Sequence, residues 1–172
     1  MKKIIIALSL LCLTIPSLAE KTEDMYIMRL TTQGQLFFIS ENIFPSTDRT
    51  FKLPFDITYL NSTDTVSLKM TVSSHTLTQV DSVALVLQDE RHVCSVVKSI
   101  YKEKDKKLWQ DRCDCAFSYE AIKKSMVQST PPQIVVYTAA GVHTYAMPPK
   151  KWLKLQPHLV EIFMLIDASK SI

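Results

Sequence analysis

The sequence predicts a mainly β protein, an antiparallel β-sandwich of immunoglobulin-like general build that carries two helices. Three observations lead to this fold class. Short segments alternate apolar and polar residues with the period of two that is typical of half-buried strands. Consecutive segments are separated by short turn sequences, which is the spacing of hairpins. Only two glycines occur in 172 residues, so most turns must use Asn, Asp, Ser and Lys.

The clearest hairpin is expected to join residues 55–60 to residues 65–72 through the turn sequence Asn-Ser-Thr-Asp. In the second segment Val66, Leu68, Met70 and Val72 all fall on one face, as a half-buried strand requires. Other segments follow the same pattern. Two more hairpins are predicted, 26–31 with 35–40 and 134–138 with 142–147, together with strands at 82–88, 92–102 and 108–117.

Two helices are expected to interrupt the strands, at about 118–128 and 157–167. Ser118 can cap the first helix, which ends before the Pro-Pro pair at 131–132. Pro157 suits the first turn of the second helix, whose apolar stripe is wide enough to be buried on more than one side. The helices are therefore expected at an edge or across one end of the sandwich.

The first nineteen residues have the pattern of a secretory signal peptide. Lys2 and Lys3 precede an apolar run at 4–15, and small residues lead to a cleavage position between Ala19 and Glu20. Cys12 does not fit a lipid-attachment sequence, because the larger Leu11 precedes it. The sequence therefore predicts an exported protein, periplasmic or secreted, with a single β-sandwich domain at 20–172.

The net charge argues against nucleic acid as a partner, and the hydropathy argues against a later membrane-spanning segment. Removal of Lys2 and Lys3 lowers the formal net charge from +3 to +1, which gives no long-range field to attract nucleic acid. The longest later apolar run, 159–166, is interrupted by Glu161 and is too short to cross a membrane. No transmembrane segment is expected after signal removal.

Three cysteines are predicted to share one face of two neighbouring strands. If residues 103–106 form the turn, Cys94 lies opposite Cys115, and a slide of two residues sets it opposite Cys113. Export into an oxidising compartment favours a disulfide from Cys94 to Cys115 or Cys113. Two alternatives remain open. These are three buried reduced thiols, or a metal site formed by His92, Cys94, Cys113 and Cys115, whose ligand types suit zinc.

Lys150, Lys151 and Trp152 form a possible binding surface, because an aromatic ring beside positive charge can recognise a glycan or a protein. The alternative is that the tryptophan closes the core. The lysines between 98 and 107 are interleaved with acidic residues and are interpreted as a solvated hairpin tip that discourages edge pairing.

In general style the chain resembles small, functionally uncharacterised secreted or periplasmic proteins of the Bacteroidetes. The likeness lies in the Met-Lys-Lys start, the scarcity of glycine and the Asn-Ser-Thr-Asp turns. Residues 64–66 (Asp-Thr-Val) and 81–83 (Asp-Ser-Val) also resemble the O-glycosylation pattern of exported proteins in that phylum. The resemblance implies export and carries no functional residues.

No catalytic motif, cofactor-binding motif or phosphate-binding loop is recognisable in the sequence. The expected function is a non-catalytic exported binding or accessory domain of the bacterial envelope, without a cofactor and with an unknown protein or glycan partner. The alternative is an exported hydrolase or a thiol/redox enzyme whose site is assembled only in space.

Overall fold

Within residues 22–170 the structure consists of two antiparallel sheets and two helices, as expected for a mainly β sandwich, and the predicted fold class is confirmed. The computed structural model describes residues 22–170. The six-stranded sheet has the order β1-β2-β3-β4-β8-β7 and the four-stranded sheet the order β10-β9-β5-β6. The elements are β1 (Tyr26–Thr31), β2 (Gly34–Pro45), β3 (Lys52–Leu60), β4 (Thr65–Ser74), β5 (Val80–Leu87), β6 (Glu90–Cys94), β7 (Val97–Asp105), β8 (Leu108–Ser118), α3 (Tyr119–Val127), β9 (Gln133–Thr138), β10 (Gly141–Ala146) and α4 (Pro149–Ser169).

The three predicted hairpins form as the turn sequences indicate. β1 pairs with β2, β3 with β4, and β9 with β10, each in antiparallel register. β1 and β2 are joined by a two-residue turn that Gly34 closes with a φ of 133°, a conformation that favours glycine. Local patterning was sufficient to predict these pairs because each is formed by neighbours in the sequence.

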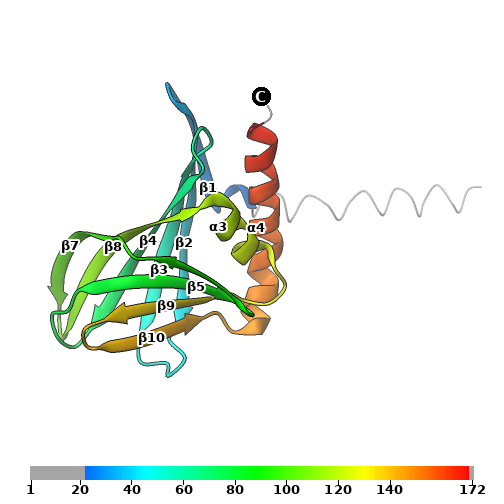
Figure 1. Cartoon of the computed structure of the whole chain (residues 1–172). Coiled ribbons are helices and arrows are strands. Elements are labelled where there is room, and N and C mark those ends of the chain that lie inside the picture. Colours follow the sequence, from blue (N-terminus) through cyan, green and yellow to red (C-terminus); the bar gives the residue numbers. More distant parts are fainter. Residues whose placement is uncertain (1–21, 171–172) are drawn as a thin grey trace, which may run out of the picture.

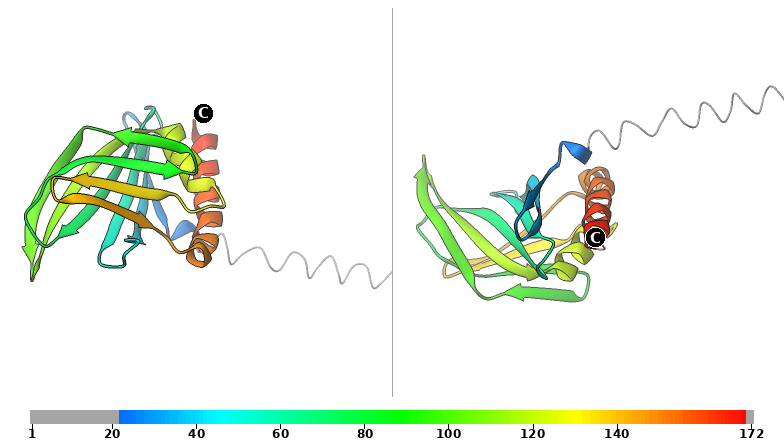
Figure 2. Two further views of the ribbon diagram at one scale, coloured as in Figure 1. Left: turned by 60° about the horizontal axis from the view of Figure 1, so that its bottom comes forward. Right: turned by 90° about the horizontal axis from the view of Figure 1, so that it is seen from above.

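A continuous apolar core lies between the sheets, and the two helices close one end of it (Figures 1 and 2). The alternating residues of β4 that the sequence placed on one face are all buried, with Leu68 and Met70 at 0 % exposure. Tyr59 and Tyr119 stack at 4.6 Å between ring centroids and connect the sheet to α3. The helix positions expected at one end of the sandwich are therefore correct.

Helix α3 agrees with its prediction, and α4 corrects the second one. The Ser118 side chain accepts a hydrogen bond from the Ala121 N–H, as an N-cap does. Helix α4 begins at Pro149 rather than at 157, so Pro157 lies inside it and not in its first turn. Pro157 has no N–H to donate to the carbonyl of Leu153, four residues earlier in the helix. The helix tolerates this loss because Leu153 is exposed, so water can hydrogen-bond its carbonyl instead.

The predicted strand 92–102 is two strands that belong to different sheets. β6 pairs with β5 in the four-stranded sheet, the chain crosses at residues 95–96, and β7 pairs with β8 in the six-stranded sheet. The predicted turn at 103–106 is also wrong, because the turn is Lys106-Lys107 and Lys106 adopts a φ of 55°. Trp109 consequently lies opposite Lys104, and an irregularity between Ser99 and Tyr101 shifts the register once more.

Within residues 22–170, neither helix has the length and hydropathy needed to cross a membrane. The predicted signal peptide lies outside the described residues.

Candidate functional site

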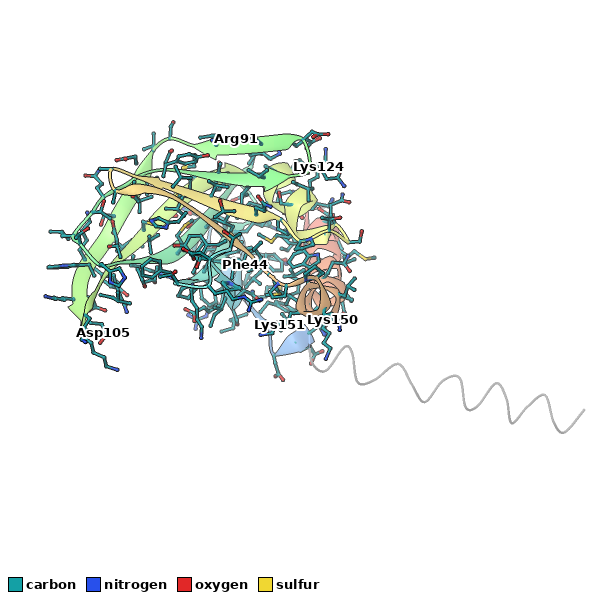
Figure 3. All side chains as sticks on the ribbon, turned by 90° about the horizontal axis from the view of Figure 1, so that it is seen from below. Phe44, Arg91, Asp105, Lys124, Lys150 and Lys151 are labelled. Atoms are coloured by element: carbon teal, nitrogen blue, oxygen red, sulfur yellow. The ribbon has the colours of Figure 1, made fainter. Side chains whose placement is uncertain are left out.

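The predicted surface of Lys150, Lys151 and Trp152 lies at the start of α4, where the two lysines differ from the tryptophan in exposure. Both lysines are exposed at this end of the molecule, far from Asp105 at the tip of the β7–β8 hairpin (Figure 3). Trp152 is fully buried, so its indole cannot be presented to a partner. The indole N–H donates to the Gln128 carbonyl at 2.8 Å, and the ring meets Phe44 edge-on. This tryptophan fixes α4 against α3 and the core.

Two loops bring other residues to the lysines. The β2–β3 loop is held against β10 by an isolated bridge between Ser46 and Tyr145 and by the Thr47 N–H, which donates to the Thr144 carbonyl at 2.9 Å. β10 then leads through Met147 into Pro148, whose carbonyl accepts the N–H groups of Lys151 and Trp152 and starts the helix. Residues about one hundred positions apart thus meet at one end of the sandwich.

A cavity of about 550 Å³ opens between the β2–β3 loop and the start of α4. Its polar rim includes Arg49 and Lys52, and Phe51 and Met147 are among its apolar lining residues. Arg49 has a φ of 60°, a left-handed conformation that is uncommon outside glycine, and its N–H donates to the Ser46 carbonyl at 2.9 Å to close a tight turn. The cavity therefore combines an apolar floor with positive charge.

A second cavity of about 250 Å³ shares one lining residue, Met147, with the first. Lys151, Lys154 and Leu155 supply its α4 wall. The residues that line the two cavities include Arg49, Lys52, Lys151 and Lys154, and none of the lining residues is Asp or Glu. We call these two cavities and their shared Met147 the α4-end cavities.

The nearest carboxylate of the loop is already engaged. The Ser46 hydroxyl donates to Asp48 at 2.5 Å, and the Thr50 N–H donates to the same oxygen at 3.0 Å. The Ser46 hydrogen bond, followed by that of the Thr50 backbone, holds the pKa of Asp48 below its usual range. Asp48 is therefore an anion that stabilises the loop, because both of these hydrogen bonds come from residues of the loop itself.

The three cysteines meet in the core, but they come from opposite sheets. Cys94 ends β6 and lies opposite Val83, whereas Cys113 and Cys115 lie on β8, where Cys115 is opposite Val97. The predicted placement of Cys94 against Cys115 or Cys113 on neighbouring strands is therefore wrong. All three are buried free thiols in the structure, so the predicted disulfide is not formed there.

Although no disulfide joins them, the neighbouring thiols change the pKa of Cys115. The Cys113 thiol, then burial, then the Cys94 thiol all raise the pKa of Cys115 far above its ordinary value. The Cys113 thiol donates to the Met70 carbonyl, and the Cys94 thiol donates to the Val96 carbonyl. Since the thiolate is the reactive form, Cys115 is a poor nucleophile in this environment.

Cys94 also lines a cavity of about 360 Å³ where the chain crosses from β6 to β7. Lys98 and Asp114 line the same cavity and lie directly opposite each other in the β7–β8 ladder. We call it the crossover cavity. Unlike the α4-end cavities, it contains both signs of charge.

The predicted metal alternative is not supported by the geometry. His92 pairs with Glu90 at 3.7 Å instead of turning to the thiols. Within residues 22–170, no three His, Cys, Asp or Glu side chains are arranged to hold a metal ion, and this includes His92, Cys94, Cys113 and Cys115.

The other histidines have contacts of a structural kind. His75 and His143 both lie against the Phe51 ring, and the His158 ring hydrogen-bonds the Thr22 hydroxyl at 2.7 Å. The Thr22 hydroxyl also donates to Glu161, which fastens the start of the described chain to α4. Their partners differ from the Ser–His–acid arrangement of a hydrolase.

Sequence reasoning identified Lys150 and Lys151 but missed Arg49, Lys52 and Lys154. No local pattern connects the β2–β3 loop to α4, because the contact depends on the pairing of Ser46 with Tyr145. The cluster of polar residues at 46–50 was the one available signal that this turn could carry function. Comparison with protein-family models, curated proteins and solved structures found no match to the chain.

Proposed function

We propose that the protein is an exported, non-catalytic binding domain of a bacterial envelope and that the α4-end cavities bind an extended anionic partner. The observation that carries this proposal is the lining of the two cavities. Two cationic side chains line each cavity together with apolar residues, and no carboxylate lines either cavity. Acidic groups of a partner, spaced along a chain, can pair with these cations while the intervening atoms cover Phe51 and Met147.

Physical chemistry favours such a partner over a small neutral ligand. The cavities adjoin each other at Met147, so a ligand that follows both must be extended. The first turn of a 21-residue helix adds partial positive charge beside Pro148 and Pro149, which line the larger cavity. A carboxylate or sulfate group placed there gains from both the side chains and the helix end.

The redox alternative is less well supported. A thiol enzyme activates its cysteine by lowering the pKa, whereas the surroundings of Cys115 raise it. The buried thiols behave as small apolar core residues, in agreement with their place between the sheets.

The binding test uses two anionic probes, an oligogalacturonate and a polyglutamate, and a neutral oligosaccharide of similar length as control. Isothermal titration calorimetry should show binding of at least one anionic probe and none of the neutral one, with an affinity that falls as salt is added. Lys52→Glu and Lys151→Glu, one from each cavity, should each lower the affinity by roughly tenfold, about 1.4 kcal/mol. Lys106→Glu at the β7–β8 turn is the matched control and should leave the affinity unchanged.

Failure of both anionic probes to bind, or equal losses for Lys106→Glu and Lys52→Glu, would reject the proposed site. The difference between the probes identifies the partner, since a polyuronate is a glycan and polyglutamate mimics an acidic protein segment.

Export is tested separately, by intact-mass measurement of the protein recovered from its own host. The expected form begins at Glu20 and carries no lipid. A mass that corresponds to a chain beginning at a lipid-modified Cys12, or to the full 172 residues, would contradict the expected cleavage.

A further inference from the structure

The outer edge of β1 is an open sheet edge of unusual composition. β1 is the first strand in the order of the six-stranded sheet, and no strand within residues 22–170 pairs with its other side. Side chains on both of its faces are exposed, with Ile27 at 50 %, Met28 at 53 % and Leu30 at 83 %. The β1–β2 hairpin also extends beyond the body of the sandwich (Figure 1). A second chain can therefore approach this edge.

The hydrogen-bond ladder shows which backbone groups face outward. The Ser40 N–H donates to the Met25 carbonyl at 2.8 Å, and the two-residue turn closes at Thr31 and Gly34. In an antiparallel pair the residues that bond to the neighbour alternate along the strand. Met25, Ile27, Arg29 and Thr31 therefore bond to β2. Tyr26, Met28 and Leu30 direct their N–H and C=O groups away from it.

β1 lacks the charge that protects the opposite edge. β7, the other outer strand of the same sheet, contains Lys98, Lys102 and Lys104 together with Glu103 and Asp105. Lysines on an edge strand discourage pairing with another chain. Arg29 is the one charged residue among the six of β1. Of the two open edges of the six-stranded sheet, β1 is thus the one that lacks a row of protecting charges.

We propose that a second copy of this chain pairs with β1 in antiparallel orientation, with Met28 opposite Met28 of the second copy. This register uses all three outward-directed residues of each copy. It sets Tyr26 opposite Leu30 of the second copy on the inner face, and Ile27 opposite Arg29 of the second copy on the outer face. No like charges are opposed, so the edge is complementary to itself, as a two-fold interface requires.

The side chains around β1 suit the outer-face contact. Phe38 lies opposite Ile27 on β2 and is 37 % exposed. Across the interface, the guanidinium of Arg29 from the second copy can therefore lie over Ile27 and meet the Phe38 ring, a favourable cation–aromatic contact.

On the inner face the contact extends toward α4. Leu165 follows His158 by seven residues, so both lie on the same side of the helix. His158 hydrogen-bonds Thr22 at the base of β1, and Leu165 is 43 % exposed. The two-fold pairing covers Met28 and Leu30 and places both α4 helices on the same face of a joined sheet.

The dimer extends the proposed function without depending on it, because β1 contributes to neither of the α4-end cavities. Sedimentation equilibrium of the purified protein over about 1 μM to 1 mM should show a reversible monomer–dimer equilibrium. Met28→Lys should make the protein monomeric by setting two lysines opposite each other at the two-fold axis. Leu30→Lys, at a more exposed position, should weaken the dimer at least tenfold. Circular dichroism and the melting temperature should stay unchanged for both.

Ile100→Lys is the matched control, since Ile100 is 52 % exposed and lies on the opposite edge strand β7. It should dimerise as the wild-type chain does. A wild-type chain that remains monomeric at 1 mM, or a dimer that survives both Met28→Lys and Leu30→Lys, would overturn the proposal. Equal weakening by Ile100→Lys would also overturn it, because the contact would then not be specific to β1.

Discussion

The crossover cavity and the α4-end cavities both place cationic side chains beside apolar residues, yet they differ in what surrounds the charge. Lys98 lies opposite Asp114 across the β7–β8 ladder, and the Ser67 hydroxyl donates to that carboxylate at 2.6 Å. At the α4 end, Lys52 and Lys151 line cavities that contain no carboxylate. Lysine content alone therefore does not indicate a binding surface. The neighbours matter as well, because a carboxylate lies opposite the lysine at the crossover cavity, whereas the α4-end cavities have none among their lining residues.

The β8 side of the molecule neutralises its charges most completely at Arg112. Its guanidinium hydrogen-bonds Thr71 on the neighbouring strand β4 and Asp56 on β3, the strand beyond β4, and only 16 % of the Arg112 side chain and 5 % of the Asp56 side chain are exposed. A buried pair of this kind is costly to break because removal of one member leaves the other charge desolvated and without its hydrogen-bond partner.

The largest expected effect comes from breaking that pair. Arg112→Met should lower the free energy of unfolding by about 3–5 kcal/mol, measured by urea denaturation, because Asp56 is left buried without its cation. Lys124→Met is the matched control. It removes one member of the Lys124–Glu90 pair, in which both side chains are about half exposed, and should change stability by less than about 1 kcal/mol. Similar losses for the two variants would show that the burial difference between the pairs has no energetic consequence.

A carboxylate introduced at the α4 end would give its cavities the mixed charge of the crossover cavity, and its effect on binding rests on the proposed function. Thr47 is exposed and lines the larger α4-end cavity. Thr47→Asp supplies the missing carboxylate and should lower the affinity for an anionic probe by roughly tenfold, about 1.4 kcal/mol, with little change in stability. Thr47→Asn has nearly the same shape without the charge and should bind as the wild-type chain does. If Asn and Asp weaken binding equally, shape and not charge determines recognition at this cavity.

A smaller effect concerns the thiols beneath the crossover cavity. Cys94 lines the cavity and is 6 % exposed, while Cys113 and Cys115 are at 0 %. Iodoacetamide should therefore modify Cys94 before the other two in the native protein, as mass spectrometry of tryptic peptides can show. Cys94→Ala should cost about 1 kcal/mol, the cost of removing one buried heavy atom from a packed site.

The same samples decide between the free thiols of the structure and the disulfide that the sequence predicted. Without reductant, denaturant should expose all three of Cys94, Cys113 and Cys115 to alkylation. Alkylation of only one of them would show that a bridge forms in the native host, and the loss on replacing Cys94 would then rise to about 2–5 kcal/mol.

The cysteines also show what the sequence could and could not predict. Period-two patterning identified the inward face of β8, including Cys113 and Cys115, because that property is local. It could not detect that residues 95–96 carry the chain from one sheet to the other, since nothing in an alternating pattern distinguishes one long strand from two short ones. The pairing of Cys94 was therefore placed in the wrong sheet, although the three thiols do meet in the core.

The candidate site was partly predictable for the same reason. Lys150 and Lys151 are neighbours in sequence and were identified, but their association with Arg49 and Lys52 depends on a long-range contact of the β2–β3 loop. Trp152 was placed on the predicted surface because the start of α4 was expected eight residues too late. With the true start, Trp152 falls on the same buried stripe as Leu159 and Ile166, at helical spacing.

The smallest expected effect is a dependence of stability on pH at the far end of α4. Asp167 accepts hydrogen bonds from Lys123 at 2.7 Å and from the Tyr119 hydroxyl at 2.8 Å. Burial opposes ionisation, but the hydrogen bonds from Lys123 and Tyr119 outweigh it and hold the pKa of Asp167 below its usual range. Burial, followed by the Asp167 hydrogen bond, raises the pKa of Tyr119. At neutral pH Asp167 is therefore an anion that accepts the hydrogen bond, and Tyr119 keeps the proton that it donates.

Because the pKa of Asp167 is lower in the folded chain than in the unfolded one, the carboxylate stabilises the fold at pH values above its unfolded pKa. That contribution is lost as the pH falls below about 4 toward the folded value. Asp167→Asn removes it, so the difference in unfolding free energy between wild type and variant should be constant from about pH 6 to pH 8 and should shrink on acidification. The effect is small because the Asp167 side chain is 39 % exposed and solvent screens the pair. Urea denaturation at a series of pH values measures it, with Asp48→Asn as a second carboxylate variant on the β2–β3 loop, which lies near the start of α4, at the opposite end of the helix from Asp167. A difference that grows as the pH falls would mean that the pKa of Asp167 is raised by burial and that its hydrogen bonds do not outweigh desolvation.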